Sequence, residues 1–199
     1  DFIMFSLQAI KHFTTVDGGL LLCKDQSDYE RGKLLRWYGI DRDEKRKEFR
    51  CEEDIVEYGY KYHMNDISAT IGIEQLKYID EIVGKHVDNQ EYYDRTLQNI
   101  KGVVVIKKPS VSKSSSWLYT LHIYKRDLFN AWMSEQNIMT SRVHERNDKH
   151  TAFSDSLCKL PGVDAFNATQ VSIPVGWWIT REDREYIVNK VQEFSDLHL

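Results

Sequence analysis

The sequence predicts an α/β fold, in which short apolar strands alternate with amphipathic helices. Strands are expected where apolar runs are bounded by glycine or proline, as in residues 20–23, 103–106 and 171–175. Helices are expected where apolar residues recur at three- and four-residue spacing, as in residues 66–83 and 180–194. With 199 residues and a composition typical of globular proteins, the chain can bury a sizeable core.

Charge and cysteine content exclude several classes of function. The net charge of -4 is spread over both signs without a basic stripe, which argues against a nucleic-acid partner. No apolar run has the length of a membrane span and no charged-then-apolar leader opens the chain, so we expect a cytoplasmic protein with no membrane partner. Cys23, Cys51 and Cys158 are far apart and form no Cys-x-x-Cys pair, which predicts free thiols.

The first residues place a lysine on short, rigid backbone. Lys11 lies between an apolar run and the turn-forming residues Thr14-Thr15 and Asp17-Gly18-Gly19. Such a setting holds an amine at a fixed place, as a Schiff-base lysine requires. The amine must also be neutral, and a desolvated pocket or a neighbouring cation favours the neutral form. The alternative is an ordinary solvated lysine.

The first third of the chain predicts a hairpin, a helix and a loop. Residues 20–23 are expected to pair with the segment that leads into Lys11. Residues 27–38 read as a helix with Ser27 or Asp28 as N-cap, ended by Gly39. Residues 41–54 carry dense charge of both signs and are interpreted as a solvated loop, or alternatively as a loop that closes over a ligand.

The longest helix is expected to begin at Asn65 or Asp66 and to continue past Val83. We predict a domain boundary within it, which divides the chain into residues 1–82 and 83–199. Beyond it come a strand at 103–106, a serine-rich loop at 110–116 and a strand at 117–124. The serine-rich loop is interpreted as a surface connection rather than a ligand-binding loop.

The last third predicts two helices and one strand. Asp127 is expected to cap a helix, residues 160–162 to form a turn, and residues 171–175 to form the final strand, which ends at a proline. Trp177 and Trp178 are interpreted as a structural anchor rather than a ligand platform. Thr180 begins a capping-box helix with a buried apolar stripe.

The lysine segment resembles a family signature. Phe5, Ser6, Lys11 and, in the turn, Thr14, Thr15, Gly18 and Gly19 match the pattern Phe-Ser-Phe-His-x-Thr-Lys-x-x-Thr-Thr-Gly-Glu-Gly-Gly of the DegT/DnrJ/EryC1/StrS family of pyridoxal-phosphate-dependent nucleotide-sugar aminotransferases. Asp17 stands where Glu is usual, and Gln8 and Ile10 depart from the pattern, so neither of the latter is given a role. The resemblance implies that Lys11 holds the cofactor as a Schiff base and that the Ser6 hydroxyl binds its phosphate.

A second segment, residues 59–72, resembles the family motif Gly-Tyr-Asn-Tyr-Arg-Met-Thr-Asp-Ile-x-Ala-Ala-Ile-Gly. Lys61 takes the place of the Asn that reaches the cofactor phosphate of the other subunit, and His63 replaces the Arg. Since an ammonium can bind phosphate as a point charge, the resemblance implies a phosphate contact for Lys61, with an exposed structural lysine as the alternative. His63 is interpreted as structural.

The segment around residues 141–153 is rich in hydrogen-bond donors. A metal site is disfavoured because its two histidines lack a third ligand at a familiar spacing, so no metal is expected. The resemblance implies that this loop approaches the substrate, with donors suited to sugar hydroxyls or phosphate. The candidate substrate-binding residues are Arg142, His144, Arg146, Asn147 and His150.

The resemblance implies the C-terminal portion of a fold type I, aspartate aminotransferase-like enzyme: a truncated large domain followed by a small α+β domain. It implies pyridoxal 5′-phosphate as cofactor, a homodimer, and amino transfer, from glutamate, to a nucleotide-linked keto-deoxysugar in polysaccharide or amino-sugar biosynthesis. Other family members deoxygenate sugars and often carry His at the lysine position, so Lys11 favours transamination.

Several parts of the family's cofactor pocket normally precede the lysine motif. These are the carboxylate that pairs with the pyridine nitrogen, the aromatic ring stacked on the cofactor, and the phosphate loop. We therefore expect this chain alone to bind the cofactor weakly or not at all. The alternatives are a catalytically silent sugar-nucleotide-binding or interaction module of the same fold, or a structural domain without a ligand.

Overall fold

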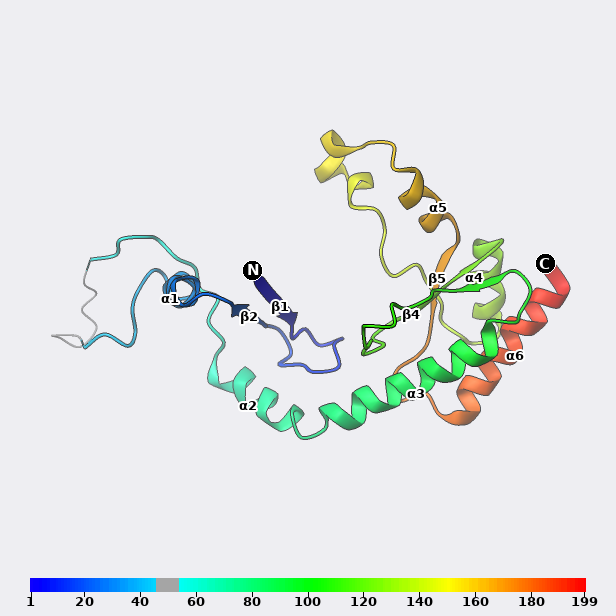
Figure 1. The fold of residues 1–199 in the computed structure, drawn as a ribbon, viewed down its shortest axis with the longest axis horizontal. Helices are drawn as coiled ribbons and strands as arrows, with labels where there is room; N and C mark the ends of the chain where they lie inside the picture. The colour runs from blue at the N-terminus through cyan, green and yellow to red at the C-terminus, as the bar shows by residue number, and fades with distance from the viewer. Residues whose placement is uncertain (46–53) are drawn as a thin grey trace. The chain divides into compact units, whose positions relative to one another are not determined.

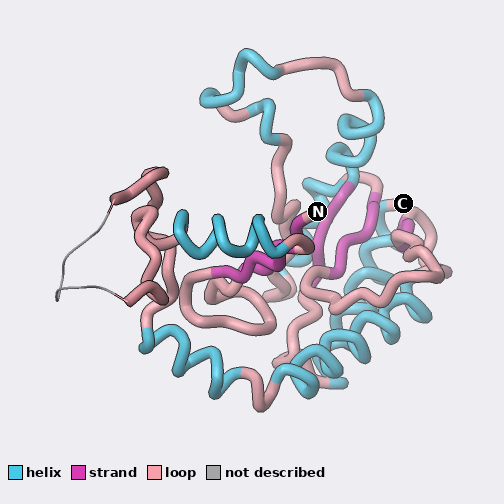
Figure 2. The backbone as a smooth tube through the Cα atoms, turned by 60° about the vertical axis from the view of Figure 1, so that its left-hand side comes forward, coloured by secondary structure: helices cyan, strands magenta, loops and turns pink. Residues whose placement is uncertain are grey.

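The computed structural model describes residues 1–45 and 54–199, which form two compact units (Figures 1 and 2). Unit 1 comprises Asp1–Ile79 and unit 2 comprises Asp80–Leu199. The sequence predicts a boundary after residue 82, whereas the contacts divide the chain after Ile79. None of the helices described is both long and apolar enough to cross a membrane.

Unit 1 begins with the predicted hairpin. Strands β1 (Phe2–Ser6) and β2 (Gly19–Cys23) pair antiparallel, with Phe2 opposite Cys23 and Ser6 opposite Gly19. A Cβ atom at Gly19 would lie 2.9 Å from the Phe5 carbonyl oxygen, so the close approach of the strands requires glycine there. Large apolar side chains on both strands remain exposed, namely Phe2, Ile3, Met4, Phe5, Leu20, Leu21 and Leu22.

Helix α1 (Gln26–Leu35) is shorter than predicted and begins earlier. The predicted N-caps, Ser27 and Asp28, are wrong, because Asp25 occupies the N-cap position and makes no side-chain cap hydrogen bond. The helix ends before Tyr38 and Gly39, which both have positive φ, and the Gly39 amide donates to the Leu34 carbonyl at 2.9 Å. Cys51 and most of the charged run at 41–54 lie outside the described residues, so the loop predicted there is untested.

The predicted long helix is in fact two helices, α2 (Asp66–Gln75) and α3 (Ile79–Leu97). The Asn65 side chain accepts a hydrogen bond from the Ser68 amide at 2.9 Å, which confirms Asn65 as the N-cap. The chain turns between the two helices, where the Tyr78 amide donates to the Gln75 carbonyl at 3.0 Å. No Gly or Pro marks this turn, so the sequence carries no signal for it.

Unit 2 contains an antiparallel sheet with the strand order β3 (Val103–Val105), β4 (Tyr119–Ile123), β5 (Gln170–Ile173). Burial alternates along β4: Tyr119, Leu121 and Ile123 are buried, while Thr120 and His122 are only partly so. This two-residue period is expected for a sheet with one face on the core and one polar face.

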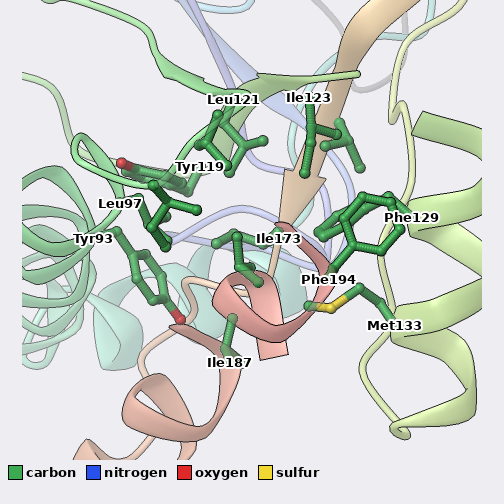
Figure 3. Close-up of a cluster of buried hydrophobic side chains, with 14 of the residues drawn as sticks. Tyr93, Leu97, Tyr119, Leu121, Ile123, Phe129, Met133, Ile173, Ile187 and Phe194 are labelled. Atoms are coloured by element: carbon green, nitrogen blue, oxygen red, sulfur yellow. The ribbon is translucent and has the colours of Figure 1, made fainter. Parts of the chain in front are cut away.

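The apolar face of this sheet packs on helices α3, α4 (Arg126–Glu135) and α6 (Arg181–His198) (Figure 3). Each fully buried apolar side chain contributes about 1.5–3 kcal/mol relative to exposure, so this core holds unit 2 together. The predicted capping box at Thr180 and Asp183 is confirmed. The largest buried side chains are Tyr93, Leu97, Leu121, Ile123, Phe129, Met133, Val171, Val191 and Phe194.

Two local predictions in unit 2 are wrong. Asp127 lies in the first turn of α4, and Lys125, with φ of 55°, takes the N-cap position. The turn predicted at residues 160–162 is the beginning of a further helix, α5 (Pro161–Thr169). Proline is favoured at the first helical position, because the N–H that it lacks would have no hydrogen-bond partner within the helix there. Two short 3₁₀ helices precede it, η1 (Asn147–Lys149) and η2 (Thr151–Ser156).

Candidate active site

The loop that carries Lys11 is closed by backbone hydrogen bonds at Leu7. The Leu7 amide donates to the Gly18 carbonyl at 2.9 Å, and the Leu7 carbonyl accepts from the Thr15 amide at 3.0 Å and the Thr14 hydroxyl at 3.1 Å. Leu7 and Thr15 are 3% and 1% exposed, although most of the loop is more open. The loop between β1 and β2 is therefore folded on itself rather than extended.

The two threonines hold strained backbone at the base of this loop. The Thr14 hydroxyl accepts from the Val16 amide at 2.9 Å, and the Thr15 hydroxyl donates to the Asp17 carbonyl at 2.6 Å. Between and after them, Val16 has a φ of 75° and Gly18 a φ of 130°. A β-branched residue at positive φ needs such support. The Thr-Thr pair of the motif thus has a structural role in this chain.

Lys11 and Ser6 lie in and beside this closed loop. The Lys11 amide donates to the Gln8 carbonyl at 3.0 Å, which forms a turn, and the residue is partly buried. Ser6 ends β1 and is exposed, and its hydroxyl lies 3.5 Å from the Gln8 amide nitrogen. An amine and a hydroxyl are thus both presented by one compact segment.

Helix α2 packs directly on the Lys11 loop. Gly72 is buried, and a Cβ atom there would lie 2.9 Å from the Thr15 methyl carbon and 3.5 Å from the Phe13 ring. A Cβ atom at Gly18 would lie 3.5 Å from the terminal methyl of Met64, just before the helix. The two segments that resemble family motifs therefore meet at small residues within unit 1.

Lys61 is held by a backbone pairing with the end of α1. It forms an antiparallel bridge with Trp37, and the Tyr62 amide donates to the Arg36 carbonyl at 2.9 Å. A Cβ atom at Gly59 would lie 2.6 Å from the Leu35 carbonyl oxygen, so this approach requires glycine. The backbone of Lys61 is fixed, while its side chain is exposed.

A basic cluster surrounds His63, which the sequence alone did not reveal. The His63 ring lies 3.8 Å from the Trp37 ring, and the Arg42 guanidinium lies 4.6 Å from the same indole. Burial lowers the pKa of His63, and the positive charges of Lys61, Arg42 and Arg36 lower it further. Within the described residues, the buried Nδ1 atom of His63 makes no hydrogen bond. His63, Trp37, Arg36 and Arg42 line part of a cavity of about 110 Å³.

The predicted substrate loop lies in unit 2 and is tied to β5. Ser141 pairs with Ser172, and the His144 carbonyl accepts from the Gln170 side chain at 3.3 Å. Arg142 forms an ion pair with Glu145 at 2.7 Å. The pKa of Glu145 is lowered, first by the Arg146 amide, then by the Asn167 side chain and the charge of Arg142.

Arg146 is the most buried of the predicted substrate-binding residues, with 9% exposure. Its Nε donates to Asp148 at 2.8 Å, and its two terminal nitrogens donate to Asp148, Asp164 and the Cys158 carbonyl. These contacts raise the pKa of Arg146, chiefly through the hydrogen bonds with Asp148. In this structure Arg146 braces the segment between η1 and α5, and its role toward substrate remains a prediction.

The other predicted residues of this loop are open to solvent. Asn147 and His150 are exposed at η1, and the His150 amide donates to the Asn147 carbonyl at 3.2 Å. His144 is exposed, with its ring 6.2 Å from that of Trp117. Ser6, Lys11 and Lys61 belong to unit 1, and Arg142, His144, Arg146, Asn147 and His150 belong to unit 2. In the described ranges, no group of three or more His, Cys, Asp or Glu residues is placed to hold a metal ion.

Known proteins resemble this chain over nearly its whole length. A UDP-4-amino-4,6-dideoxy-N-acetyl-beta-L-altrosamine transaminase from Campylobacter jejuni is 27% identical over 196 residues, which cover 94% of this chain and 50% of that protein. An uncharacterised protein from Methanocaldococcus jannaschii is 29% identical, over 97% of this chain and 53% of its own length. The chain thus spans about half the length of these relatives.

Solved structures give the same result for the fold. The sugar aminotransferase CalS13 from Micromonospora echinospora has a TM-score of 0.92 at 34% identity, over 97% of this chain and 52% of its own. AtS13 from Actinomadura melliaura has a TM-score of 0.92 at 36% identity, over 97% and 51%. A Streptococcus pneumoniae protein classed with the sugar aminotransferases, solved in PLP and PMP forms, has TM-scores of 0.87 and 0.88 at 23% identity, over 100% of this chain and 53–54% of its own. These likenesses confirm the predicted α/β fold of type I transferases.

The family model of the DegT/DnrJ/EryC1/StrS aminotransferases matches residues 1–192, which include the Lys11 loop, the segment at 59–72 and the predicted substrate loop. The resemblance found in the motifs is thereby confirmed for the chain as a whole. This chain belongs to the DegT/DnrJ/EryC1/StrS aminotransferase family.

Proposed function

We propose that this chain is the C-terminal half of an enzyme that transfers an amino group, from glutamate, to a keto carbon of a nucleotide-linked deoxysugar. The observation that carries the proposal is the closed loop of residues 7–18, which contains Lys11 and directly follows Ser6 at the end of β1. The relatives support the substrate class, since the Campylobacter protein is named as a transaminase of a UDP-linked amino sugar.

The residues of the loop fit pyridoxal 5′-phosphate. That cofactor needs an amine for its aldehyde and donors for its phosphate, and Lys11 and Ser6 are residues of those two kinds on one segment. Lys61 adds an exposed ammonium on fixed backbone, within the basic surroundings of Arg36, Arg42 and His63. When bound, pyridoxal phosphate supplies an electron sink for the carbon that gains or loses the amino group.

Each residue of the chain has a separate task in this proposal. The Lys11 Nζ would hold the cofactor, and as a free amine it would take up and return the proton of the substrate carbon. The Ser6 hydroxyl donates to the phosphate. Lys61 is proposed to reach the phosphate of a second subunit, which makes the active form a homodimer.

The loop at 142–150 is proposed to hold the substrate. Arg142, His144, Asn147 and His150 supply donors at its surface that suit sugar hydroxyls, phosphate or the glutamate carboxylate. Arg146 is assigned to the same site, although its nitrogens contact Asp148, Asp164 and Cys158 in this structure. We therefore expect its effect on substrate to pass through the position of the loop.

The test measures a covalent label and an activity. The 199-residue chain is incubated with pyridoxal phosphate and borohydride, and the labelled peptide is found by mass spectrometry. Weak labelling is expected, and any specific label should fall on Lys11 rather than on Lys24, the exposed lysine after β2. Lys11→Ala should abolish it, while Lys24→Ala should not.

The activity is then measured on the complete reading frame that encodes this chain, with glutamate and a UDP-linked or TDP-linked 4-keto-6-deoxysugar. Formation of the amino sugar, and its loss in Lys11→Ala, is the expected result. A complete protein that binds the sugar nucleotide but never takes up the amino group would favour the silent binding module instead.

A further inference from the structure

Two neighbouring tryptophans in unit 2 remain open to solvent. Trp177 is 50% exposed and Trp178 is 62% exposed, although the sequence predicts a structural anchor rather than a ligand platform there. They lie in the segment of residues 174–180, between β5 and α6 (Figure 1). Their rings meet edge to face, with centroids 5.9 Å apart. Large aromatic surface exposed at one place is unusual unless it serves contact with a ligand or partner.

Hydrogen bonds from side chains of α3 hold the backbone of the segment that carries the tryptophans. Asn89 on α3 is 3% exposed, and its side-chain amide donates to the Gly176 carbonyl at 3.1 Å and to two further carbonyls, of Val175 and Ile179, at 3.4 Å. The Tyr93 hydroxyl donates to the Pro174 carbonyl at 2.9 Å. The Trp178 ring lies so close over Gly176 that a Cβ atom there would overlap it. The backbone of this segment and the Trp178 ring are therefore fixed in place before any ligand arrives.

Arg184 on α6 holds the Asn89 side chain in position. Its guanidinium donates to Asp88 at 2.5 Å and to the Asn89 side-chain oxygen at 3.1 Å, and it lies 4.6 Å from the Tyr92 ring centre. The Asn89 side chain is therefore held at both polar atoms: its nitrogen donates to the carbonyls of the segment, and its oxygen accepts from Arg184. A buried polar network of this kind costs desolvation, and here it fixes the backbone beneath two exposed indoles.

Trp177, Trp178 and Asn89 line a cavity of about 280 Å³, close to the lower end of the size range of small-molecule sites. Three basic side chains line it, Lys85, Arg181 and Arg184, against one carboxylate, Asp88. Lys85 and Arg181 also form ion pairs with Glu81 and Glu185, one turn away on the same helices. Such exposed pairs are weak, so both cations can exchange their partner for an anion of a ligand.

We propose that this cavity binds a nucleoside phosphate, with the base on the exposed indole of Trp177 and the phosphate at Lys85 and Arg181. Each of the three cations has a carboxylate partner, so a phosphate would bind by displacing Glu81 from Lys85 and Glu185 from Arg181. The flat indole favours a ligand with a π-face, which every nucleobase has. The site lies beyond the C-terminal end of β5, whereas the predicted substrate loop contacts Gln170 at the other end. It is thus separate from the residues assigned to amino transfer, and it does not depend on that proposal.

The test uses tryptophan fluorescence of the 199-residue chain, titrated with uridine 5′-monophosphate, uridine and inorganic phosphate. Saturable quenching by the monophosphate is expected, with weaker binding of uridine and of phosphate alone, because each lacks one half of the contact. Binding of the monophosphate should weaken as salt rises. Equal affinity for uridine and its monophosphate would contradict the assigned cations, and no saturable quenching at millimolar nucleotide would overturn the proposal.

Three variants assign the binding to this cavity. Trp177→Ala should weaken binding about tenfold, the effect of losing one stacked base. Lys85→Glu should weaken binding of the monophosphate while leaving that of uridine unchanged. Lys101→Glu, which makes the same charge change at an exposed lysine away from the cavity, should change neither.

Isothermal calorimetry of Trp177→Ala supplies a readout that does not depend on the removed fluorophore, and circular dichroism checks that the variant is folded. Unchanged affinity in folded Trp177→Ala would overturn the proposal. Concentration-dependent self-association that Trp177→Ala abolishes, without nucleotide binding, would show instead that the tryptophans contact a second copy.

Discussion

Gly72 of helix α2 packs against the methyl group of Thr15, the residue that closes the Lys11 loop; a Cβ atom at position 72 would lie 2.9 Å from that methyl carbon. Gly72→Ala is therefore expected to destabilise unit 1 by about 1–3 kcal/mol, the cost of overpacking a tight contact. Chemical denaturation measures it. Gly84→Ala is the matched control, because Gly84 is also helical but has no atom within 4 Å of its would-be Cβ. That change should stabilise the chain by about 0.5–1 kcal/mol.

Asn89 joins α3 to the segment after β5 through hydrogen bonds to three carbonyls. Asn89→Ala leaves these buried carbonyls and the Arg184 guanidinium without a partner at that position, so we expect a loss of about 1–3 kcal/mol in the free energy of unfolding of unit 2. Asn189→Ala, at an exposed position on α6, should stay within about 0.5 kcal/mol of the parent. Equal effects of the two changes would contradict the structure.

One buried histidine, His86, and one partly buried histidine, His122, are expected to make the stability of unit 2 depend on pH. Burial lowers the pKa of His86 and of His122 below the ordinary value of 6.5. As the pH falls below about 6.5, the unfolded chain therefore takes up protons before the folded chain does, and the free energy of unfolding falls. Melting curves between about pH 7.5 and 5.5 measure this trend. His86→Gln should flatten it, while His150→Gln, at an exposed position, should not.

Arg146 is expected to hold the segment between η1 and α5 in place. Its guanidinium bridges Asp148 and Asp164, and a lysine there cannot form the same two-nitrogen contact with a carboxylate. Arg146→Lys should speed proteolytic cleavage within residues 149–160 and leave the core of unit 2 folded. Arg95→Lys, at an exposed position on α3, serves as control. A cleavage rate unchanged by Arg146→Lys would show that the contacts of the Arg146 guanidinium with Asp148 and Asp164 are not needed to hold this segment.

The exposed apolar side chains of β1 and β2 are expected to make the 199-residue chain self-associate. Met4 is 81% exposed in this hairpin, among other exposed apolar residues, and such patches are rare on proteins that stay monomeric. Met4→Lys should shift the chain toward the monomer in sedimentation velocity. Val111→Lys adds the same charge at an isolated residue that is 95% exposed, and it should have little effect.

The sequence was most informative where a structural signal is local. Gly18 and Gly19 between apolar runs predict the hairpin, and Thr180 with Asp183 predicts the start of α6, because each signal involves neighbours along the chain. The turn between α2 and α3 carries no glycine or proline, so no residue type marks it. Helix α5 is not predicted, because Pro161-Gly162 is equally typical of a turn. Both depend on packing that residue types alone do not report.

The same distinction applies to the candidate site. The motif positions at Ser6 and Lys11 could be read from the sequence, since short-range bonds from Leu7, Thr14 and Thr15 shape their loop. The partners of Arg146 could not, because Asp164 is 18 residues away and on a helix that was not predicted. The cations beside His63 also come from separate parts of the sequence, since Arg36 and Arg42 precede residues 46–53 and Lys61 follows them. Their proximity could therefore not be read from the sequence.

The bridge between Ser141 and Ser172 brings together the two ends of a long insertion in the sheet of unit 2. The cost in entropy of closing such a loop grows only slowly with its length, and the buried core lies on the opposite face of the sheet. Residues 142–169 thus form an insert whose replacement would have to keep its contacts with β4, where the His122 ring meets the Thr169 hydroxyl at 2.9 Å and the Phe166 ring at 4.7 Å.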